Sequence, residues 1–239
     1  MNLKAIKHAH EIYKVDIITM AFGYPRGERN VNLDAYDAME QAIANAVAAK
    51  VLVFAAASNR GSLDAVSVAY PAGETSVICI HACKALSRRS EFTAGMDTQK
   101  MNFAVIGEDV LSAWPVHKGS GIGGNKAPKK RKSGTSTSVT IAASIAGLIL
   151  QLVRLPKPAE QDLPLRTLER VRDRLKTFGG MCRILEKMSQ KVDGYYCITP
   201  WPVIDLHSSN YSSSPEKARV EIIKEITKHL ALYYPIPSR

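Results

Sequence analysis

The first half of this chain contains a series of short segments that are apolar almost without interruption. Residues 15–23, 51–58 and 77–82 each have the length of a strand, and residues 102–106 form a shorter fourth segment. Strands that are apolar on both faces are typical of parallel sheets covered by helices on both sides. The sequence therefore predicts an α/β domain of three layers with a mostly parallel sheet.

Helical patterns lie between and after these strands. Residues 2–14 and 32–50 carry apolar side chains at helical spacing, and residues 138–153 are apolar nearly all round. A helix of that last kind is expected in the interior of a domain. Residues 116–133 are rich in Gly and Lys, so we expect a solvated loop there.

The character of the chain changes after residue 153. A proline-rich stretch precedes a basic amphipathic helix at residues 165–178, and Gly179 and Gly180 are expected to break that helix. An extended segment at residues 195–206 and a final helix ending near residue 233 follow. We therefore expect one unit at residues 1–153 and a basic, mainly helical extension at residues 154–239.

The composition excludes several other classes of protein. Hydrophobic residues make up 46% of the chain and charged residues 23%, which is typical of a soluble globular protein. The longest apolar run, residues 141–153, is too short to span a bilayer, so we expect no membrane association. The four cysteines lack zinc-type spacing, and the polar opening residues show no secretory pattern. We expect a cytoplasmic protein with free thiols and without a metal or cofactor.

The first motif that could take part in catalysis is Gly-Thr-Ser-Thr-Ser at residues 134–138, where the apolar helix begins. The free N–H groups and the positive dipole end of a helix favour negative charge beside Ser136. Gly134 permits the tight turn that would expose this hydroxyl. Taken alone, the pentapeptide is explained more simply as a helix cap.

The second motif is Ala-Ala-Ala-Ser-Asn-Arg-Gly at residues 55–61, at the carboxyl end of an expected strand. Ligands bind at this edge of open α/β sheets. The side-chain NH₂ group of Asn59 could donate to an oxyanion there. An ordinary turn asparagine is the alternative.

In chain order, these and further segments resemble the subtilisin-like serine proteases, the subtilase family. The resemblance spans about residues 1–152. The matching segments are IITMAFG at 17–23, FAAASNRG at 54–61, YPA at 70–72, VICIHA at 77–82, SEF at 90–92, GEDVLSAWP at 107–115 and GTSTS at 134–138.

The resemblance implies a partial subtilisin-like fold, in which residues 1–153 are the C-terminal portion of the peptidase domain, and serine-type endopeptidase activity on polypeptides. Ser136 would be the nucleophile, and Asn59 would stabilise the oxyanion together with the backbone N–H of Ser136. Two groups of residues would bind substrate: Ala21, Phe22 and Gly23 by backbone pairing, and Ala55, Ala56 and Ala57 by lining the pocket for the residue before the cleaved bond.

The chain also departs from the family pattern. The family's catalytic Asp, in an Asp-Ser/Thr-Gly motif, and its catalytic His, in His-Gly-Thr, both precede the strand at residues 15–23, and neither motif is present. His8 and His10 lack the following Gly-Thr, so we expect them to be surface residues. Ser58 replaces a family glycine and Thr140 a family proline.

A serine without a base to accept its proton is a weak nucleophile. We therefore expect this chain to be inactive alone. Either it is a fragment of a peptidase, or it is a pseudoprotease that acts as a peptide- or protein-binding module. The sequence leaves both open.

A third hypothesis concerns charge. The net charge is +10, and the basic run at residues 128–132 resembles a nuclear localisation signal or a phosphate-binding segment. A solvated loop is the simpler explanation, so we do not expect nucleic-acid binding.

Overall fold

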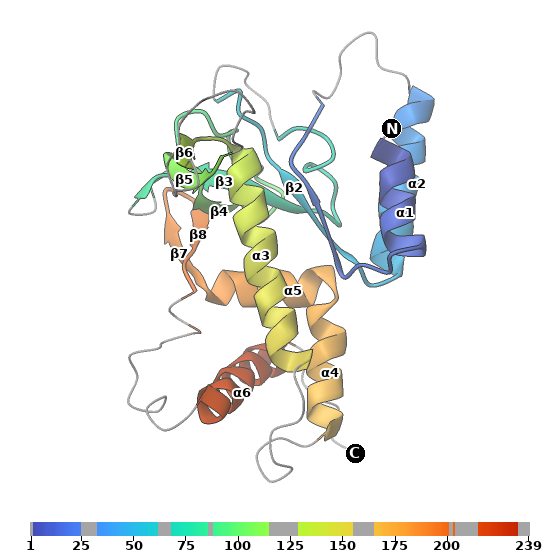
Figure 1. Cartoon of the computed structure of the whole chain (residues 1–239), viewed down its shortest axis with the longest axis vertical. Helices are drawn as coiled ribbons and strands as arrows, with labels where there is room; N and C mark the ends of the chain where they lie inside the picture. The colour runs from blue at the N-terminus through green and yellow to red at the C-terminus, as the bar shows by residue number, and fades with distance from the viewer. Residues whose placement is uncertain are drawn as a thin grey trace, which may run out of the picture.

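The computed structural model describes residues 2–24, 33–61, 68–85, 88–114, 129–154, 165–200, 203 and 215–233. Its centre is a six-stranded sheet in the order β1-β2-β3-β4-β8-β7 (Figure 1). The strands are β1 (Ile17–Met20), β2 (Leu52–Ala56), β3 (Ile78–Cys83), β4 (Phe103–Ile106), β7 (Ser189–Val192) and β8 (Tyr195–Ile198). All neighbouring pairs are parallel except β7 and β8. This confirms the predicted α/β class.

Helices cover both faces of the sheet. They are α1 (Asn2–Glu11), α2 (Leu33–Ala48), α3 (Thr135–Arg154), α4 (Leu165–Leu175), α5 (Phe178–Lys187) and α6 (Pro215–Tyr233). Alternate residues of β2 belong to different cores: Val53 and Ala55 pack with α1 and α2, whereas Phe54 and Ala56 pack with α3. Because successive side chains of a strand point to opposite faces, this division gives the three predicted layers.

The residues beyond 154 share the sheet and the core with the rest of the chain. Strand β8 pairs with β4, with Phe103 opposite Tyr196. Leu168 of α4, Leu185 of α5 and Ile223 of α6 are fully buried in the cluster that also contains the inner face of α3. The expected domain border after residue 153 stays a prediction. In the structure, one hydrophobic core includes residues on both sides of this border.

One predicted loop is partly a strand. Lys129–Lys132 form β6, which pairs antiparallel with β5 (Val110–Ala113) in a separate two-stranded ribbon. The expectation of a loop was wrong for these four residues, because β5 supplies partners for their backbone while the charged side chains stay exposed. Residues 116–128 of the expected loop lie outside the described part of the chain.

The glycine pair also behaves differently from the expectation. Helix α4 ends at Leu175, but Gly179 and Gly180 lie in the first turn of α5. The Thr177 side chain caps this turn by accepting a hydrogen bond from the Gly180 N–H at 3.1 Å. A Cβ on Gly180 would lie 1.9 Å from the Arg174 carbonyl oxygen. Gly180 therefore permits the close approach between α4 and α5 rather than ending a helix.

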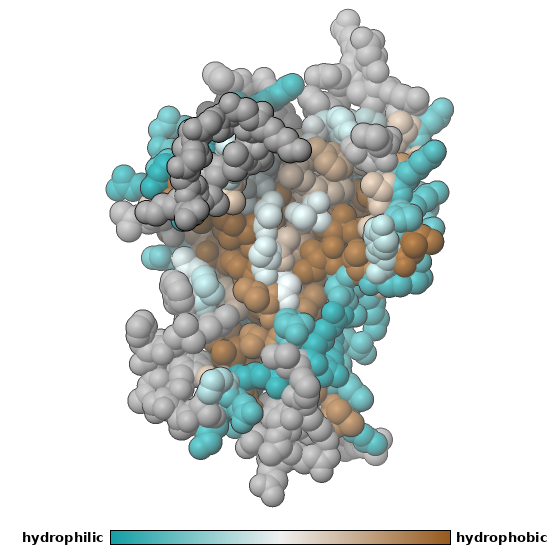
Figure 2. Space-filling view, in the orientation of Figure 1, coloured by the Kyte–Doolittle hydropathy of each residue, from teal (hydrophilic) through white to brown (hydrophobic). Residues whose placement is uncertain are grey.

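Helix α3 is less buried than its sequence predicts. Its inner face, including Ala142, Ala146 and Ile149, packs on the sheet, but Leu148 on the outer face is 67% exposed. By length and composition α3 could cross a membrane, yet 39% of its most apolar 18-residue stretch is buried in the domain. Figure 2 shows apolar surface around α3 on the face toward the viewer. Within the described residues, no element covers this outer face.

The two N-terminal histidines also differ from each other. His8 is exposed, as expected, but His10 is buried on the same face of α1 as Ile6. Its Nδ1 lies 3.1 Å from the Ile6 carbonyl oxygen. The expectation of a surface position was wrong for His10, since the residue four positions after a buried one shares its helix face.

The two faces of α3 give a paired test of this packing. We expect Ile149→Ala to lower the free energy of unfolding by about 2–5 kcal/mol, because Ile149 is 1% exposed and truncation leaves a cavity. Leu148→Ala should change it by less than about 1 kcal/mol. Urea denaturation monitored by circular dichroism measures both values. Equal losses for the two variants would show that the outer face of α3 is covered in solution.

A buried histidine predicts acid sensitivity. Burial lowers the pKa of His81 from 6.5 to about 4, and its ring lies 3.6 Å from the Cys79 sulfur and against Tyr195. The unfolded chain therefore takes up a proton that the folded chain excludes. Stability should fall by up to about 3 kcal/mol as the pH drops from 6.5 to 4.

Melting temperatures measured at steps between pH 7 and pH 4 test this expectation. The fall in melting temperature toward pH 4 should be smaller in His81→Leu than in the parent chain. It should be unchanged in the control His8→Gln, which removes an exposed imidazole. An unchanged slope in His81→Leu would contradict the assignment.

Candidate active site

The candidate nucleophile stands at the beginning of α3. Ser136 is exposed and is the second residue of the helix. Its hydroxyl donates to the Ala21 carbonyl oxygen at 3.1 Å. The N–H groups of Thr137 and Ser138 are directed at the Gly134 carbonyl, 3.0 and 3.4 Å away. The Ser136 N–H has no acceptor among the described residues, as is usual for the first turn of a helix.

Asn59 joins the loop after β2 to the same helix terminus. Its Oδ1 accepts hydrogen bonds from the Thr135 N–H at 2.8 Å and from the Thr135 hydroxyl at 2.9 Å. These two bonds use the amide oxygen and leave the NH₂ group as a donor. Gly134 has a φ of +153°, and a Cβ there would lie 3.3 Å from Asn59 Nδ2. The structure thus brings residues 59 and 136 to one place.

The end of β4 holds this helix terminus in position. The Gly134 N–H donates to the Gly107 carbonyl at 2.8 Å, and the buried Ser138 hydroxyl donates to the Val105 carbonyl at 3.1 Å. A Cβ on Gly107 would lie 1.9 Å from the Ser138 Oγ. A side chain at residue 107 would therefore displace the turn that carries Ser136.

The predicted substrate-binding residues fall into two groups. Ala21 and Gly23, just after β1, are exposed and Phe22 is half-buried, so their backbone lies open beside Ser136. Ala55, Ala56 and Ala57 are buried within the two core clusters at and after the end of β2. The pocket-lining role of these three alanines stays a prediction.

Two contributors to the site were missed from the sequence. Thr135 anchors Asn59 through both its N–H and its hydroxyl, and the Ala21 carbonyl accepts from the Ser136 hydroxyl. The threonine was visible inside the motif at residues 134–138, but its partner lies 76 residues away. The Ala21 carbonyl belongs to the backbone, so the residue type at this position does not indicate that it binds Ser136.

The arrangement provides donors for an oxyanion but no base for the serine. In the described part of the chain, neither an imidazole nor a carboxylate is hydrogen-bonded to the Ser136 hydroxyl. The two possible oxyanion donors, the Asn59 NH₂ and the Ser136 N–H, lie at the positive end of the 20-residue helix α3. The site as described is suited to bind a carbonyl oxygen and to stabilise negative charge on it.

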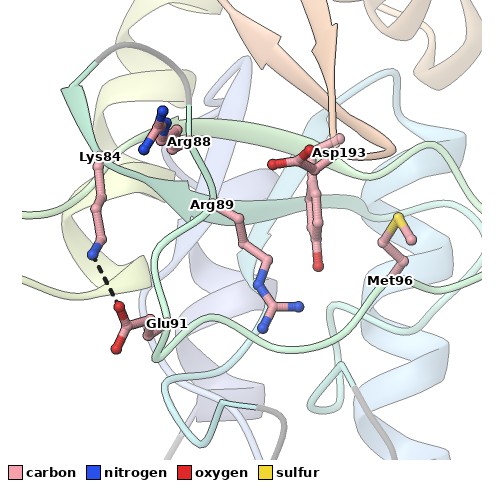
Figure 3. A pocket seen from close by; sticks show the side chains of 7 residues that line it. Lys84, Arg88, Arg89, Glu91, Met96 and Asp193 are labelled. Atoms are coloured by element: carbon pink, nitrogen blue, oxygen red, sulfur yellow. Dashed lines mark hydrogen bonds and ion pairs between the residues drawn. The ribbon is translucent and has the colours of Figure 1, made fainter.

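A separate cleft of about 490 Å³ lies beside the loop that follows β3. Its lining residues are Lys84, Arg88, Arg89, Glu91, Met96, Asp193 and Tyr195 (Figure 3). Lys84 forms ion pairs with Glu91 at 3.2 Å and Glu108 at 3.7 Å. The lining contains none of the predicted site residues, so this cleft is distinct from the Ser136 site.

Comparisons with known proteins indicate the family and the fold of the chain. A model of the subtilase family of peptidases matches residues 2–177. The subtilisin-like protease het-Q2 of Podospora anserina is 30% identical over 186 residues, which cover 77% of this chain and 47% of that protein. The chain thus spans about half the length of this curated relative.

Solved structures resemble the fold at lower identity. The prenylagaramide maturation protease PagA superposes with a TM-score of 0.57 and 21% identity, covering 96% of this chain and 66% of the other. The PatG macrocyclase in complex with peptide gives a TM-score of 0.57 and 19% identity, covering 94% and 55%. At these identities the likeness shows the fold alone.

The anchoring of Asn59 predicts different effects for two substitutions. Asn59→Ala removes the acceptor for two Thr135 donors and should lower the free energy of unfolding by about 1 kcal/mol. Asn59→Asp keeps an acceptor and adds negative charge at the start of α3, so stability should stay near that of the parent. Urea denaturation distinguishes the two outcomes. Equal destabilisation by both would contradict the role of the amide oxygen.

Proposed function

This chain belongs to the subtilase family, and on that premise we propose that it carries the nucleophile and the oxyanion donors of a serine endopeptidase acting on polypeptides. As the Ser136 hydroxyl attacks the scissile carbonyl, its proton passes to a base; the C–N bond then breaks and the amine leaves with that proton. Water hydrolyses the resulting acyl-enzyme to a carboxylic acid and free Ser136. The Asn59 NH₂ and the Ser136 N–H stabilise the tetrahedral oxyanion. Ala21, Phe22 and Gly23 pair with the substrate backbone as an added strand.

The observation that carries this proposal is the joint anchoring at the start of α3. Thr135 binds the Asn59 oxygen at 2.8 and 2.9 Å, and the next residue, Ser136, donates to the Ala21 carbonyl at 3.1 Å. A nucleophile, an oxyanion donor and an exposed backbone segment therefore meet at one surface. A carbonyl bound there would lie next to all three.

The proposed chemistry needs a base, and none of the described residues is placed to act as one for Ser136. The Ala21 carbonyl holds the Ser136 proton but is far too weak a base to remove it during attack. In subtilisin, the family's namesake, loss of the catalytic His or Ser lowers turnover by about a million-fold. We propose that the Asp and His are supplied by a further segment of the family fold, and that this chain alone is inactive.

Two surfaces that no described element covers support the proposal that the chain is the C-terminal part of a catalytic domain. Strand β1 is at the edge of the sheet, and its residues Ile17, Ile18 and Thr19 are half-buried or exposed, unlike the buried β2 and β3. The outer face of α3 exposes Leu148 and leaves Ile145 partly buried. A strand added beside β1 and a helix placed on α3 would cover both surfaces.

The second candidate function is that of a pseudoprotease that binds a polypeptide without cleaving it. It is favoured by Ser58 and Thr140, which replace the glycine and the proline of the family pattern. The Ser58 hydroxyl accepts from the Arg60 N–H at 3.2 Å, and the Thr140 hydroxyl donates to the Ser136 carbonyl at 2.9 Å. Both replacements fit locally, so binding without catalysis is compatible with this site.

Fluorophosphonate labelling tests the catalytic proposal. We expect no labelling of the chain alone, because no imidazole or carboxylate in the described part of the chain is hydrogen-bonded to the Ser136 hydroxyl. Labelling should appear when the chain is co-expressed with the half of a related subtilase that bears the Asp-Ser/Thr-Gly and His-Gly-Thr motifs. Ser136→Ala should abolish it, and Ser144→Ala, a control serine on an exposed position of α3, should not.

Co-purification of the two halves must accompany the assay. If they form a complex in which Ser136 stays unlabelled, the endopeptidase proposal is wrong and the pseudoprotease is favoured. Strong labelling of the chain by itself would contradict the claim that it lacks a base.

A further inference from the structure

The basic segment at Lys129–Lys132 is built into an ordered ribbon rather than a loop. Its four residues pair with β5 in register, with Lys132 opposite Val110 and Lys129 opposite Ala113. All four side chains are exposed. The pairing holds the four Cα atoms within about 10 Å, since a strand rises roughly 3.4 Å per residue, and it places Lys130 and Lys132 on one face and Lys129 and Arg131 on the other.

Most of this positive charge lacks an acidic partner. Arg131 forms an ion pair with Asp109 at 3.1 Å. In the described ranges, no carboxylate forms an ion pair with Lys129, Lys130 or Lys132. The ammonium groups of Lys130 and Lys132 instead lie 4.7 and 4.9 Å from the centre of the Trp114 ring. The ribbon therefore presents a concentrated positive surface to solvent.

The ribbon is joined directly to the candidate active site. Only three residues separate Lys132 from Ser136, a reach of at most about 14 Å. The Ser133 hydroxyl accepts from the Asp109 N–H at 2.9 Å, and the Gly134 N–H donates to the Gly107 carbonyl at 2.8 Å. These bonds at the base of the ribbon hold its position relative to the nucleophile.

The ribbon and the substrate-pairing segment lie on opposite sides of the nucleophile. Strands β5 and β6 are on one side of the upper end of α3, and β1, which leads to Ala21, is on the other (Figure 1). A polypeptide that pairs with residues 21–23 and passes Ser136 would continue toward the ribbon. The cations would then face the part of the substrate beyond the scissile bond.

We propose that the β5–β6 ribbon recognises acidic residues of a polypeptide substrate, on the side of the scissile bond away from residues 21–23. This inference rests on the proposed function and names its substrate class. A polypeptide is favoured over a nucleic acid because the Trp114 ring contacts two lysine ammonium groups, whereas single strands are bound on open aromatic faces.

Binding to the intact chain tests the inference without catalysis. The probe is a fluorescein-labelled 12-residue peptide with four clustered Glu residues, compared with the same peptide carrying Gln. At low salt we expect the acidic peptide to bind about tenfold more tightly, because exposed ion pairs are individually weak but act together here. The difference should shrink toward 1 M salt, where the Debye length is about 3 Å.

Matched charge variants locate the effect. The triple variant Lys129→Gln, Lys130→Gln, Lys132→Gln should lose the tenfold preference. The control Lys4→Gln, Lys7→Gln, Lys14→Gln removes the same charge from exposed positions in and after α1 and should keep it. Circular dichroism checks that both variants are folded.

Three results would overturn the inference: equal binding of the Glu and Gln peptides, an unchanged preference in the ribbon variant, or tighter binding of a 12-nucleotide oligothymidine lost in that variant. The last result would assign the ribbon to nucleic acid. Because the assay does not use the Ser136 hydroxyl, it can be repeated in Ser136→Ala. If Ser136 stays unlabelled while the preference for the Glu peptide is retained, only the catalytic proposal is wrong. If Ser136 is labelled and the preference for the Glu peptide is absent, only the inference about the ribbon is wrong.

Discussion

The site depends on the contact between Asn59 and the first residue of α3. Two segments separated by 76 positions are joined when Thr135 donates its N–H and its hydroxyl to one amide oxygen. This use of the oxygen orients the NH₂ group of Asn59 and leaves the Ser136 N–H as a second donor. The parallel sheet makes the contact possible, since the loop after β2 and the turn before α3 lie at the same edge.

Much of this arrangement follows from the sequence. The strands β2, β3 and β4 are short, almost uninterrupted apolar segments, and their length together with the helical patterns between them predicts buried strands of a parallel sheet. The proximity of Asn59 and Ser136 was predicted from the order of the motifs along the chain, because each motif alone fits an ordinary turn or cap. Local pattern could not reveal β6, since four consecutive cations indicate solvent exposure whether or not the backbone is paired. The buried position of His10 and the role of Gly180 depend on neighbours elsewhere in the chain.

The surfaces around Ser136 are unequal in a way that bears on function. On the β1 side, a sheet edge and the apolar outer face of α3 remain uncovered among the described residues, as in a domain that another structural unit completes. On the other side, the β6 strand of the ribbon exposes four cations, and the Ser133 hydroxyl accepts from the Asp109 N–H at its base. The first surface fits a structural complement and the second a charged ligand. Ser136 lies between them.

A crystal structure of the complemented protein phosphonylated on Ser136 would show whether Asn59 and the start of α3 donate to the same oxygen. We expect the phosphoryl oxygen to lie about 2.7–3.1 Å from both Asn59 Nδ2 and the Ser136 backbone nitrogen. If the phosphoryl oxygen points into solvent and the Asn59 amide is turned away from it, these two groups are not oxyanion donors.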